Sequence, residues 1–340
     1  MTNDRIWPGI LIRADIDDTG TIPRTPLANS PDIPISGAQP LEDPGILTDP
    51  ESYDQVYDYD VEAGFPTYAY MRGKNMADRR IDGEWSLFYA APNILLYPSL
   101  WQQNQLANGT GDLNPPFWIE PGGVAATLDA FNWVMPVELD QCSMIGMAVT
   151  PEHGNSFNGV TALNDLVRVL AENGNVAQFN VGIVRGDVPD ITSSVHYEQG
   201  SEAPRVDIVT IFKNTPKGSS YSIAASTPLN GRTLSASGAD TQENTFKIAS
   251  VDLDIPALWA ATFNYELTFG SDWSGIPDGA GPQVEIRAEL VMQSDHPLYA
   301  LGADLDLDVA SGTLRTAADG WALHIVVAGG FRTVCADMGP

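Results

Sequence analysis

The sequence predicts an all-β protein with two β-sandwich domains, an extended proline-rich N-terminal arm and one short helix. Three observations support this prediction. Apolar and polar residues alternate with a period of two through many short segments. The 31 glycines and 25 prolines are scattered between these segments, where turns are expected. Hydrophobic residues make up 43% of the 340 residues, which is enough to form packed cores.

The chain is strongly acidic, with 44 Asp and Glu residues against 17 Lys and Arg residues and a formal net charge of −27. Such a surface repels the phosphates of nucleic acids and the headgroups of anionic lipids, so we expect neither as a partner. It favours solubility, divalent cations and basic partner surfaces. Solubility alone, for example in a salty habitat, would also explain the charge.

The sequence shows no recognisable signal peptide, because no apolar core of the required length follows residues 1–5. No run approaches the ~20 apolar residues that a membrane-spanning helix needs. We therefore expect cytoplasmic synthesis and no membrane span. Export, if it occurs, would use phage lysis, a contractile injector or a secretion system without a cleaved leader.

Residues 1–64 are predicted to form the arm. Residues 10–16 can make one short strand, residues 17–20 signal a turn, and seven prolines follow between Pro23 and Pro50. Proline removes hydrogen-bond donors and fixes φ, so this segment cannot build a long ladder of its own. It must therefore lie along its own body or along a neighbouring subunit. We expect residues 10–16 and 31–36 to be the parts that add to a sheet edge.

Residues 65–190 are predicted to form an immunoglobulin-like β-sandwich. Turn signals include Gly73-Lys74-Asn75 and Asp82-Gly83. Apolar residues at helical spacing, followed by Asn173-Gly174, predict one helix. The expected strands and edge segments span residues 67–72, 85–90, 93–101, 124–134, 142–149 and 176–184, and the helix spans residues 162–172.

Several motifs follow one another within this region. They are a strand ending in an Asn turn (68–75), a strand ending in aromatic-Ala-Ala-Pro (87–92), an aromatic strand ending in Pro (131–136), a Cys-bearing apolar strand (141–148) and, after the helix, Ala177-Gln178-Phe179-Asn180-Val181. In this order they resemble the bacterial immunoglobulin-like modules of the CARDB group over roughly residues 30–185. Gln141 departs from the aromatic residue usually found before the cysteine. The resemblance implies adhesion, spacing or assembly, and it supplies no catalytic residues.

Residues 204–340 are predicted to form a second β-sandwich or jelly roll, after a polar connection at residues 186–200. Turn signals such as Asn230-Gly231 and Asp319-Gly320 separate segments that alternate at period two. The expected strands span residues 206–212, 221–225, 233–237, 246–253, 265–270, 284–291, 298–309 and 322–334.

The sequence contains no recognisable catalytic motif. It lacks a Gly-x-Ser-x-Gly elbow, a His-Glu-x-x-His helix and a phosphate-cradling loop, and its four histidines do not pair at metal-ligand spacing. Cys142 and Cys335 lie in apolar strand-like contexts, so we expect small buried side chains rather than a nucleophile or a zinc site. The sequence leaves open whether the two cysteines are free. These observations predict a protein that is not an enzyme.

Acidic clusters are the candidate metal ligands. Asp15, Asp17 and Asp18 offer three carboxylates beside a turn, and calcium is the cation that prefers such oxygen ligands. Residues 304–308 and 252–254 also place alternate aspartates on one strand face. The alternative is a solvated acidic surface that discourages pairing between sheet edges.

Aromatic residues in loops are the candidate interaction residues. Tyr97, Trp101 and Trp118 lie in Pro- and Asn-rich loops of the first body, and Trp273 lies in a Gly- and Ser-rich loop of the second. Exposed aromatic rings beside Asn, Asp and Gln can stack on sugars or anchor a protein interface. The alternative is that these rings plug the ends of the sandwiches, as we expect for Trp85 and Trp133.

Two functions from different classes lead at this point, ahead of a third, an enzyme built on a jelly roll with convergent carboxylates or a metal in a pocket. The first is a non-enzymatic structural or interaction protein of a bacterial or phage surface, fibre or injection apparatus. Such a protein would bind itself, as a homo-oligomer, or another protein through sheet edges and its N-terminal arm. The second is a module of an adhesin or toxin that binds a glycan or a cell surface. The first hypothesis predicts that deleting residues 1–36 leaves two folded bodies and abolishes assembly.

Overall fold

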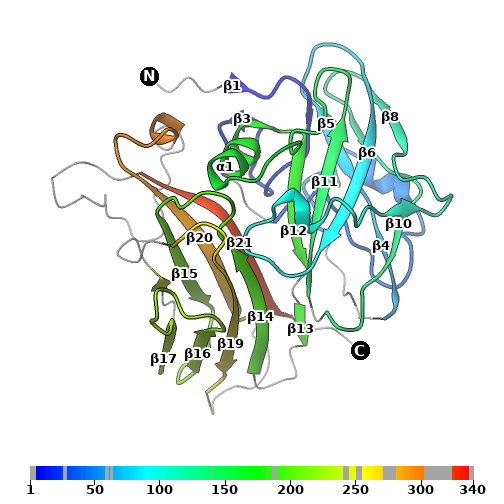
Figure 1. Cartoon of the computed structure of the whole chain (residues 1–340). Helices are drawn as coiled ribbons and strands as arrows, with labels where there is room; N and C mark the ends of the chain where they lie inside the picture. Colours follow the sequence, from blue (N-terminus) through cyan, green and yellow to red (C-terminus); the bar gives the residue numbers. More distant parts are fainter. Residues whose placement is uncertain are drawn as a thin grey trace. The chain divides into compact units, whose positions relative to one another are not determined.

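A computed structural model describes residues 5–25, 29–57, 61, 64–139, 141–181, 183–185, 190–239, 245–249, 255–270, 281–301 and 324–336 of the chain (Figure 1). These residues form mostly strands, arranged in six sheets, together with the helix α1 (Leu163–Glu172). This architecture confirms the predicted all-β fold class. No helix in the described part of the chain is both long and apolar enough to cross a membrane.

The chain divides into two compact units. Unit 1 contains residues 1–91, 96–161 and 165–181, and unit 2 contains residues 92–95, 162–164 and 182–340. The residues predicted to form a separate N-terminal arm therefore belong to unit 1. Residues 92–95 belong to unit 2 because they bond to His196 of that unit. Ile94 donates its N–H to the His196 carbonyl, and His196 donates its N–H to the Pro92 carbonyl.

Unit 1 is built from antiparallel strands. Its strands are β1 (Arg5–Ile6), β2 (Ile10–Leu11), β3 (Thr21–Ile22), β4 (Pro66–Ala69), β5 (Arg72–Asn75), β6 (Ile81–Ala90), β7 (Ala107–Asn108), β8 (Pro116–Ile119), β9 (Val124–Ala126), β10 (Phe131–Val134), β11 (Cys142–Val149) and β12 (Val176–Val181). The sheets have the orders β12-β11-β6-β8, β4-β10-β7, β2-β5-β9 and β1-β3. Two 3-10 helices, η1 (Pro44–Thr48) and η2 (Pro98–Leu100), lie between strands.

The core of unit 1 lies between the β12-β11-β6-β8 sheet and the strands of the two three-stranded sheets. Its buried cluster joins side chains of β6, β11 and β12 to side chains of β2, β4 and β10. The two layers approach closely at Gly146 of β11, where a Cβ atom would collide with the side chain of Met71. This contact buries one face of β11, and Ile145 and Met147 on the other face are also buried, so β11 reads as a continuous apolar run.

The N-terminal residues are part of this core. Strand β2 pairs with β5, and Ile10, Ile12, Ile33 and Ile35 are all at most 1% exposed. Of the two places that the sequence left open for the arm, the structure shows the arm on its own body. Because residues 1–36 supply buried core side chains, we expect their removal to disrupt the first body rather than to leave it folded.

A buried ion cluster fixes the arm to β5. Asp32 accepts hydrogen bonds from Arg13 Nη2 at 2.8 Å and from Arg72 Nε at 2.9 Å, and the side chains of all three residues are at most 3% exposed. The Arg13 guanidinium lies 3.6 Å from the ring centroid of Tyr53. Arg72 also donates to the Ser52 and Gln55 carbonyls. Asp32 thus compensates two buried positive charges, which would be costly if left unpaired.

A second arginine ties the arm to the end of α1. Arg24 donates to Asp18 Oδ2 at 3.0 Å and to the carbonyls of Ile12 and Leu170, and its N–H bonds to the Ala171 carbonyl. The last carbonyls of a helix lack partners within the helix and favour a nearby positive charge. Arg24 satisfies both needs from within the arm.

Unit 2 is a second sandwich. Its strands are β13 (Ile183–Arg185), β14 (Asp190–Glu198), β15 (Val206–Lys213), β16 (Ser220–Ala225), β17 (Ser235–Ala239), β18 (Thr245–Ala249), β19 (Ala260–Thr268), β20 (Gln283–Met292) and β21 (His324–Ala336). They form sheets of order β13-β21-β20-β15-β18 and β14-β19-β16-β17 (Figure 1). The rings of Phe212 and Tyr221 pack 5.0 Å apart across the sheets, and Tyr265 hydrogen-bonds Thr333. Among the described strands, β13 and β21 form the parallel pair.

Unit 2 departs from the sequence-based expectation in two places. Strand β14 occupies part of the segment expected to be a polar connection, because Ile191, Val195 and Tyr197 alternate inward while Ser, Thr and His side chains lie between them. In the segment expected to be a strand at residues 298–309, residues 299–301 are helical and the remainder after them lies outside the described residues.

Candidate functional site: a groove between two unpaired strand edges

Two of the three aspartates proposed as metal ligands serve the local turn, and the third, Asp17, is exposed. Asp18 accepts from Arg24 and from the N–H groups of Ala14 and Gly20 at 2.9 and 2.8 Å. Asp15 accepts from the Asp17 N–H at 2.8 Å, and burial raises the pKa of Asp15 above its usual value. A cation that took Asp18 as a ligand would have to displace Arg24. Within the described part of the chain, no group of three or more His, Cys, Asp and Glu side chains is arranged to hold a metal ion.

The four aromatic candidates have different positions. Trp101 and Tyr97 are buried, which agrees with the alternative that these rings plug the sandwich and not with an exposed interaction site. Trp101 packs edge-on between Phe88 and Phe157 at ring distances of 4.9 and 5.0 Å and so covers the outer face of β6.

Trp118 is 58% exposed, as the interaction hypothesis requires. Trp273 lies outside the described residues, as do residues 252–254 and 304–308. Trp85 and Trp133 are buried, as predicted.

Trp118 lies on β8, which is the last strand of its sheet. The next strand along the chain is β9, which is the last strand of the β2-β5-β9 sheet. The turn at residues 120–123 joins the two strands, yet each pairs with a different partner: β8 with β6 and β9 with β5. Within the described residues, no strand pairs with the outer edge of either β8 or β9.

The hydrogen-bond pattern identifies the main-chain groups at these edges. Asn75 N–H bonds to the Gly123 carbonyl and Thr127 N–H bonds to the Met71 carbonyl, so the alternate residues 123, 125 and 127 face β5. Val124 and Ala126 therefore direct their N–H and C=O groups away from β5. On β8, the Pro115 carbonyl accepts from Trp85 N–H. The main-chain N–H and C=O groups of Phe117 therefore point to β6, and those of Trp118 point away from it.

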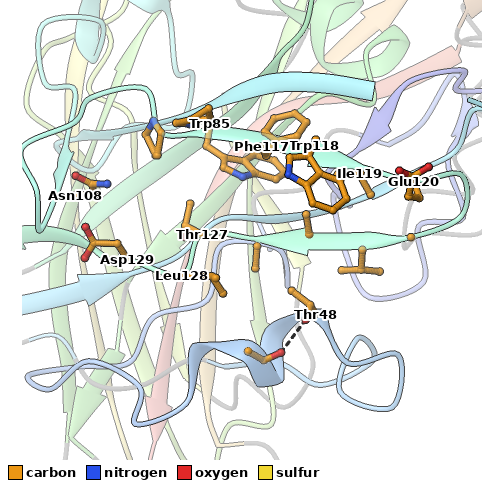
Figure 2. A pocket seen from close by; sticks show the side chains of 17 residues that line it. Thr48, Trp85, Asn108, Phe117, Trp118, Ile119, Glu120, Thr127, Leu128 and Asp129 are labelled. Atoms are coloured by element: carbon orange, nitrogen blue, oxygen red, sulfur yellow. Dashed lines mark hydrogen bonds between the residues drawn. The ribbon is translucent and has the colours of Figure 1, made fainter. Parts of the chain in front are cut away.

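A groove of about 720 Å³ lies between the two edges. Figure 2 shows the Trp85, Phe117 and Trp118 rings along its β8 side, with Thr127 and Leu128 across from them. The groove is lined by residues 115–120 and 123–129, with Gly45, Thr48, Trp85 and Asn108. Its volume is within the ~300–1,000 Å³ typical of ligand-binding pockets.

The chain leaves room for the groove because β7 ends early. Strand β7 pairs with β10 for two residues, and Gly109 adds one more bond to the Ala130 carbonyl. Asn108 Oδ1 then accepts from Thr110 and Asp112 N–H groups, and Gly111 adopts a φ of +86°. This Asn-Gly turn carries the chain away from the sheet, so the position beside β9 that a longer β7 would fill is left to the groove.

A buried indole donor lies in the groove wall. Trp85 is 1% exposed and packs 4.3 Å from Phe117, but its Nε1 has no hydrogen-bond partner among the described residues. Figure 2 shows this nitrogen on the edge of the ring that faces the space between the two strands. A buried donor without an acceptor is costly, so an oxygen atom of a bound group would be stabilised at this point.

The charges of the groove are acidic. The charged lining residues are Glu120 and Asp129, which Figure 2 shows at opposite ends. Asp129 also accepts from Thr110 N–H at 3.1 Å. Arg80 is not part of the lining; its guanidinium lies 4.7 Å from the Trp118 ring centroid and bonds to Asp82 at 2.7 Å. Arg80 therefore supports the orientation of Trp118, while the groove itself presents two carboxylates.

The described part of the chain shows no assembled nucleophile near the groove. Cys142 is fully buried in β11, and burial raises the pKa of its thiol. This agrees with the expectation that Cys142 is a small core side chain. Among the described residues, Cys142 and Cys335 are both buried and no disulfide joins them.

Comparison with known proteins gives no family. No family model and no curated protein sequence matches the chain. Three solved structures show weak likeness. Red sea bream transglutaminase has 9% identity and a TM-score of 0.21, with 70% of this chain and 30% of that chain covered. The calcium-binding domain CBD12 of CALX1.1 has 8% identity and a TM-score of 0.17, with 72% and 82% covered. The C-terminal globular domain of an oligosaccharyltransferase from Pyrococcus abyssi has 8% identity and a TM-score of 0.16, with 81% and 44% covered.

These scores are too low to support an argument about fold or function. The chain also spans less than a third of the transglutaminase.

Proposed function

We propose that this protein is a non-enzymatic interaction protein that binds an extended segment of another chain by strand addition at the β8–β9 groove. The observation that supports this most strongly is the pair of strand edges whose outward main-chain groups border one groove. An added strand gains affinity from main-chain hydrogen bonds and specificity from pockets for alternate side chains. Exposed edges are otherwise a liability that proteins cover, shorten or charge.

In this proposal the arm is a structural part of unit 1 and is not the donated strand. The sequence predicts that residues 10–16 and 31–36 add to a sheet edge, and Ile10, Leu11 and Ile35 pair with strands of their own unit. Docking is then assigned to the groove, where no strand of the described residues pairs with either edge. This retains the hypothesis of docking through sheet edges and changes the element that performs it.

A peptide-display selection tests this function. The full chain would be screened against random peptides of eight residues, beside the variant Ala126→Pro, which removes an N–H that faces the groove. Proline is tolerated at edge positions whose N–H is not used in the sheet, so the variant should fold. We expect enrichment of extended peptides on the parent chain and its loss on the variant. Equal enrichment on both proteins would contradict the proposal.

A second candidate function is glycan binding, because Trp118 is exposed in a groove that Asn108, Glu120 and Asp129 also line. Aromatic faces can stack on sugars while amide and carboxylate oxygens accept from hydroxyl groups. A glycan array probed with the parent chain and with Trp118→Ala would detect it. Signal that disappears in the variant would favour this function over strand addition, and an array without signal would remove it.

A further inference from the structure

The chemistry of the groove also indicates what kind of segment it takes, and this inference rests on the proposed function. We propose that the occupant is an extended segment of a different protein. It is small and apolar where it faces the sandwich and carries Lys or Arg at both ends. Main-chain geometry, a buried donor and charge each contribute one part of this description.

The main chain sets the direction of the segment. Strand β7 runs antiparallel to β10, and β9 precedes β10 in the same layer of unit 1. A segment that continues the line of β7 therefore runs antiparallel to β9, entering near Asp129 and leaving near Glu120. Alternate residues of such a segment meet the outward N–H and C=O groups of Val124 and Ala126, with which they form the hydrogen-bonded pairs of an antiparallel ladder.

The groove wall determines which side chains of the bound segment are suitable at the positions that face inward. Phe117 and Ile119 are buried, Trp85 packs against Phe117, and β9 contributes only Val124, Ala125 and Ala126. Inward side chains therefore meet apolar surface and need to be apolar themselves, because a polar group there would lose water without gaining a partner. The Trp85 Nε1 is the exception, since it offers one donor to an oxygen of the segment.

Charge distinguishes a different protein from a second copy. Both charged lining residues are acids and they lie at the two ends of the groove. A copy of this chain would bring a formal net charge of −27 to a surface of the same sign. Like charges oppose association and opposite charges favour it, so a basic-flanked segment of another protein fits where this chain does not.

A charge series of peptides tests this proposal on the full chain. The probes are three capped seven-residue peptides with the core Val-Thr-Val-Thr-Val, flanked on both sides by Lys, by Gln or by Glu. Affinity is measured by calorimetry at fixed salt concentration. Binding in the groove is located by the slowing of amide hydrogen exchange at Val124 and Ala126. We expect the Lys-flanked peptide to bind at least about tenfold more tightly than the Glu-flanked one, with the Gln-flanked peptide between them.

A matched pair of variants tests the buried donor. Trp85→Phe removes Nε1 and keeps an aromatic ring, and we expect it to weaken the Lys-flanked peptide about tenfold. Trp133 has a second buried Nε1 without a partner among the described residues, and Trp133 does not line the groove. Trp133→Phe should therefore leave peptide affinity unchanged, which controls for general loosening of the core.

The outcomes separate the inference from the function on which it rests. If the Glu- and Lys-flanked peptides bind equally and protect Val124 and Ala126, the basic-partner inference is overturned and strand addition stands. If none of the peptides protects these amides, both are overturned. Self-association that slows the same amides as protein concentration rises would show a second copy as the occupant and would also overturn the inference.

Discussion

The two outer strands of the β2-β5-β9 sheet differ in what lies beside them. On one side, β2 belongs to the N-terminal arm, whose arginine and aspartate side chains form a buried ion cluster with Arg72 of β5. On the other side, β9 borders a groove and presents the main-chain groups of Val124 and Ala126. The comparison teaches that one sheet can be completed on one edge by its own chain and stay available on the other.

The largest expected effect comes from removing the covered edge. Deletion of residues 1–36 takes away β1–β3, Asp32 and the buried Ile10, Ile12, Ile33 and Ile35. We expect unit 1 to lose its fixed tertiary structure, which near-ultraviolet circular dichroism would detect. Limited proteolysis should leave a resistant fragment of unit 2. A truncated chain with native near-ultraviolet signal would show that the arm is an accessory rather than part of the core.

The ion cluster accounts for part of that effect by itself. Asp32→Ala leaves Arg13 and Arg72 buried without their anion, and we expect the free energy of unfolding to fall by about 3–5 kcal/mol. The control is Asp54→Ala, since Asp54 also pairs with Arg13, at 3.4 Å, but its side chain is 84% exposed. Such exposed pairs contribute about 0–1 kcal/mol. Similar losses in urea unfolding for both variants would refute the assignment of Asp32 as the buried counter-ion.

The stability of β8, the strand at the open edge, should depend on its close packing against β6 rather than on charged side chains. A Cβ on Gly83 of β6 would lie 2.6 Å from both the Val149 carbonyl oxygen and a ring carbon of Phe117, the latter on β8. Gly83→Ala should therefore destabilise unit 1 by about 1–3 kcal/mol in urea unfolding. Gly154→Ala is the control, because a Cβ there meets nothing within 4 Å. An unchanged midpoint for Gly83→Ala would mean that β8 moves aside easily.

A smaller, pH-dependent effect is expected beside the covered edge. His153 packs against Trp7 of the arm with ring centroids 4.4 Å apart, and burial lowers the pKa of His153. Its charged neighbours Glu152 and Arg79 form an exposed pair at 3.1 Å. The unfolded chain therefore takes up a proton at a higher pH than the folded one, so stability is complete above a pH of about 6.5 and falls as the pH drops below it.

The test compares the parent chain with His153→Gln. Urea unfolding at several pH values between about 7.5 and 5 should show a decline in stability for the parent that is shallower for the variant. Parallel pH profiles for the two proteins would assign the decline to other groups.

The smallest effect is expected from calcium. The carboxylate of Asp18 is already occupied by Arg24 and two main-chain N–H groups, and Asp15 caps the same turn. Adding calcium or a chelator should therefore move the melting temperature of unit 1 by less than about 1 °C, since only ligand binding to the folded state raises it. A clear rise with calcium, lost in Asp15→Asn, would restore the metal site that the sequence suggested.

The sequence predicted the elements whose local pattern was unambiguous. The strand expected at residues 142–149 is β11, because a continuous apolar run is typical of a strand buried on both faces. The helix expected at residues 162–172 is α1, because its apolar residues recur at helical spacing. In both cases the signal lay within the segment itself.

The sequence-based predictions failed where the role of a residue depends on a contact with residues far away in the sequence. The local sequence predicts turns at Gly73 and Gly83, but both glycines lie within strands, β5 and β6. A Cβ on Gly73 would lie 3.0 Å from Trp85 and Ile10, so this glycine permits close approach between layers. The prolines and asparagines around Trp101 leave both an exposed and a buried ring open, and the structure shows the ring buried against Phe88 and Phe157.

The groove itself could not be derived from the sequence. Trp118 was identified by its local setting, but the two open edges exist only because β8 and β9 join different sheets. The sequence feature most closely related to the groove is the Asn108-Gly109 turn, which ends β7 after two residues. The pairing of Asp32 with two arginines at sequence distances of 19 and 40 residues was equally invisible.

The parallel pairing of β13 with β21 has a mechanical consequence. Ile183 lies beside Val334 and Arg185 beside Ala336, so residues at the two ends of the described part of unit 2 share one short ladder. A tensile load applied to the chain before β13 and after β21 would slide these parallel strands along each other. Their hydrogen bonds would then bear the force together instead of opening one after another. The lifetime of unit 2 under such a pull is set by its unfolding rate.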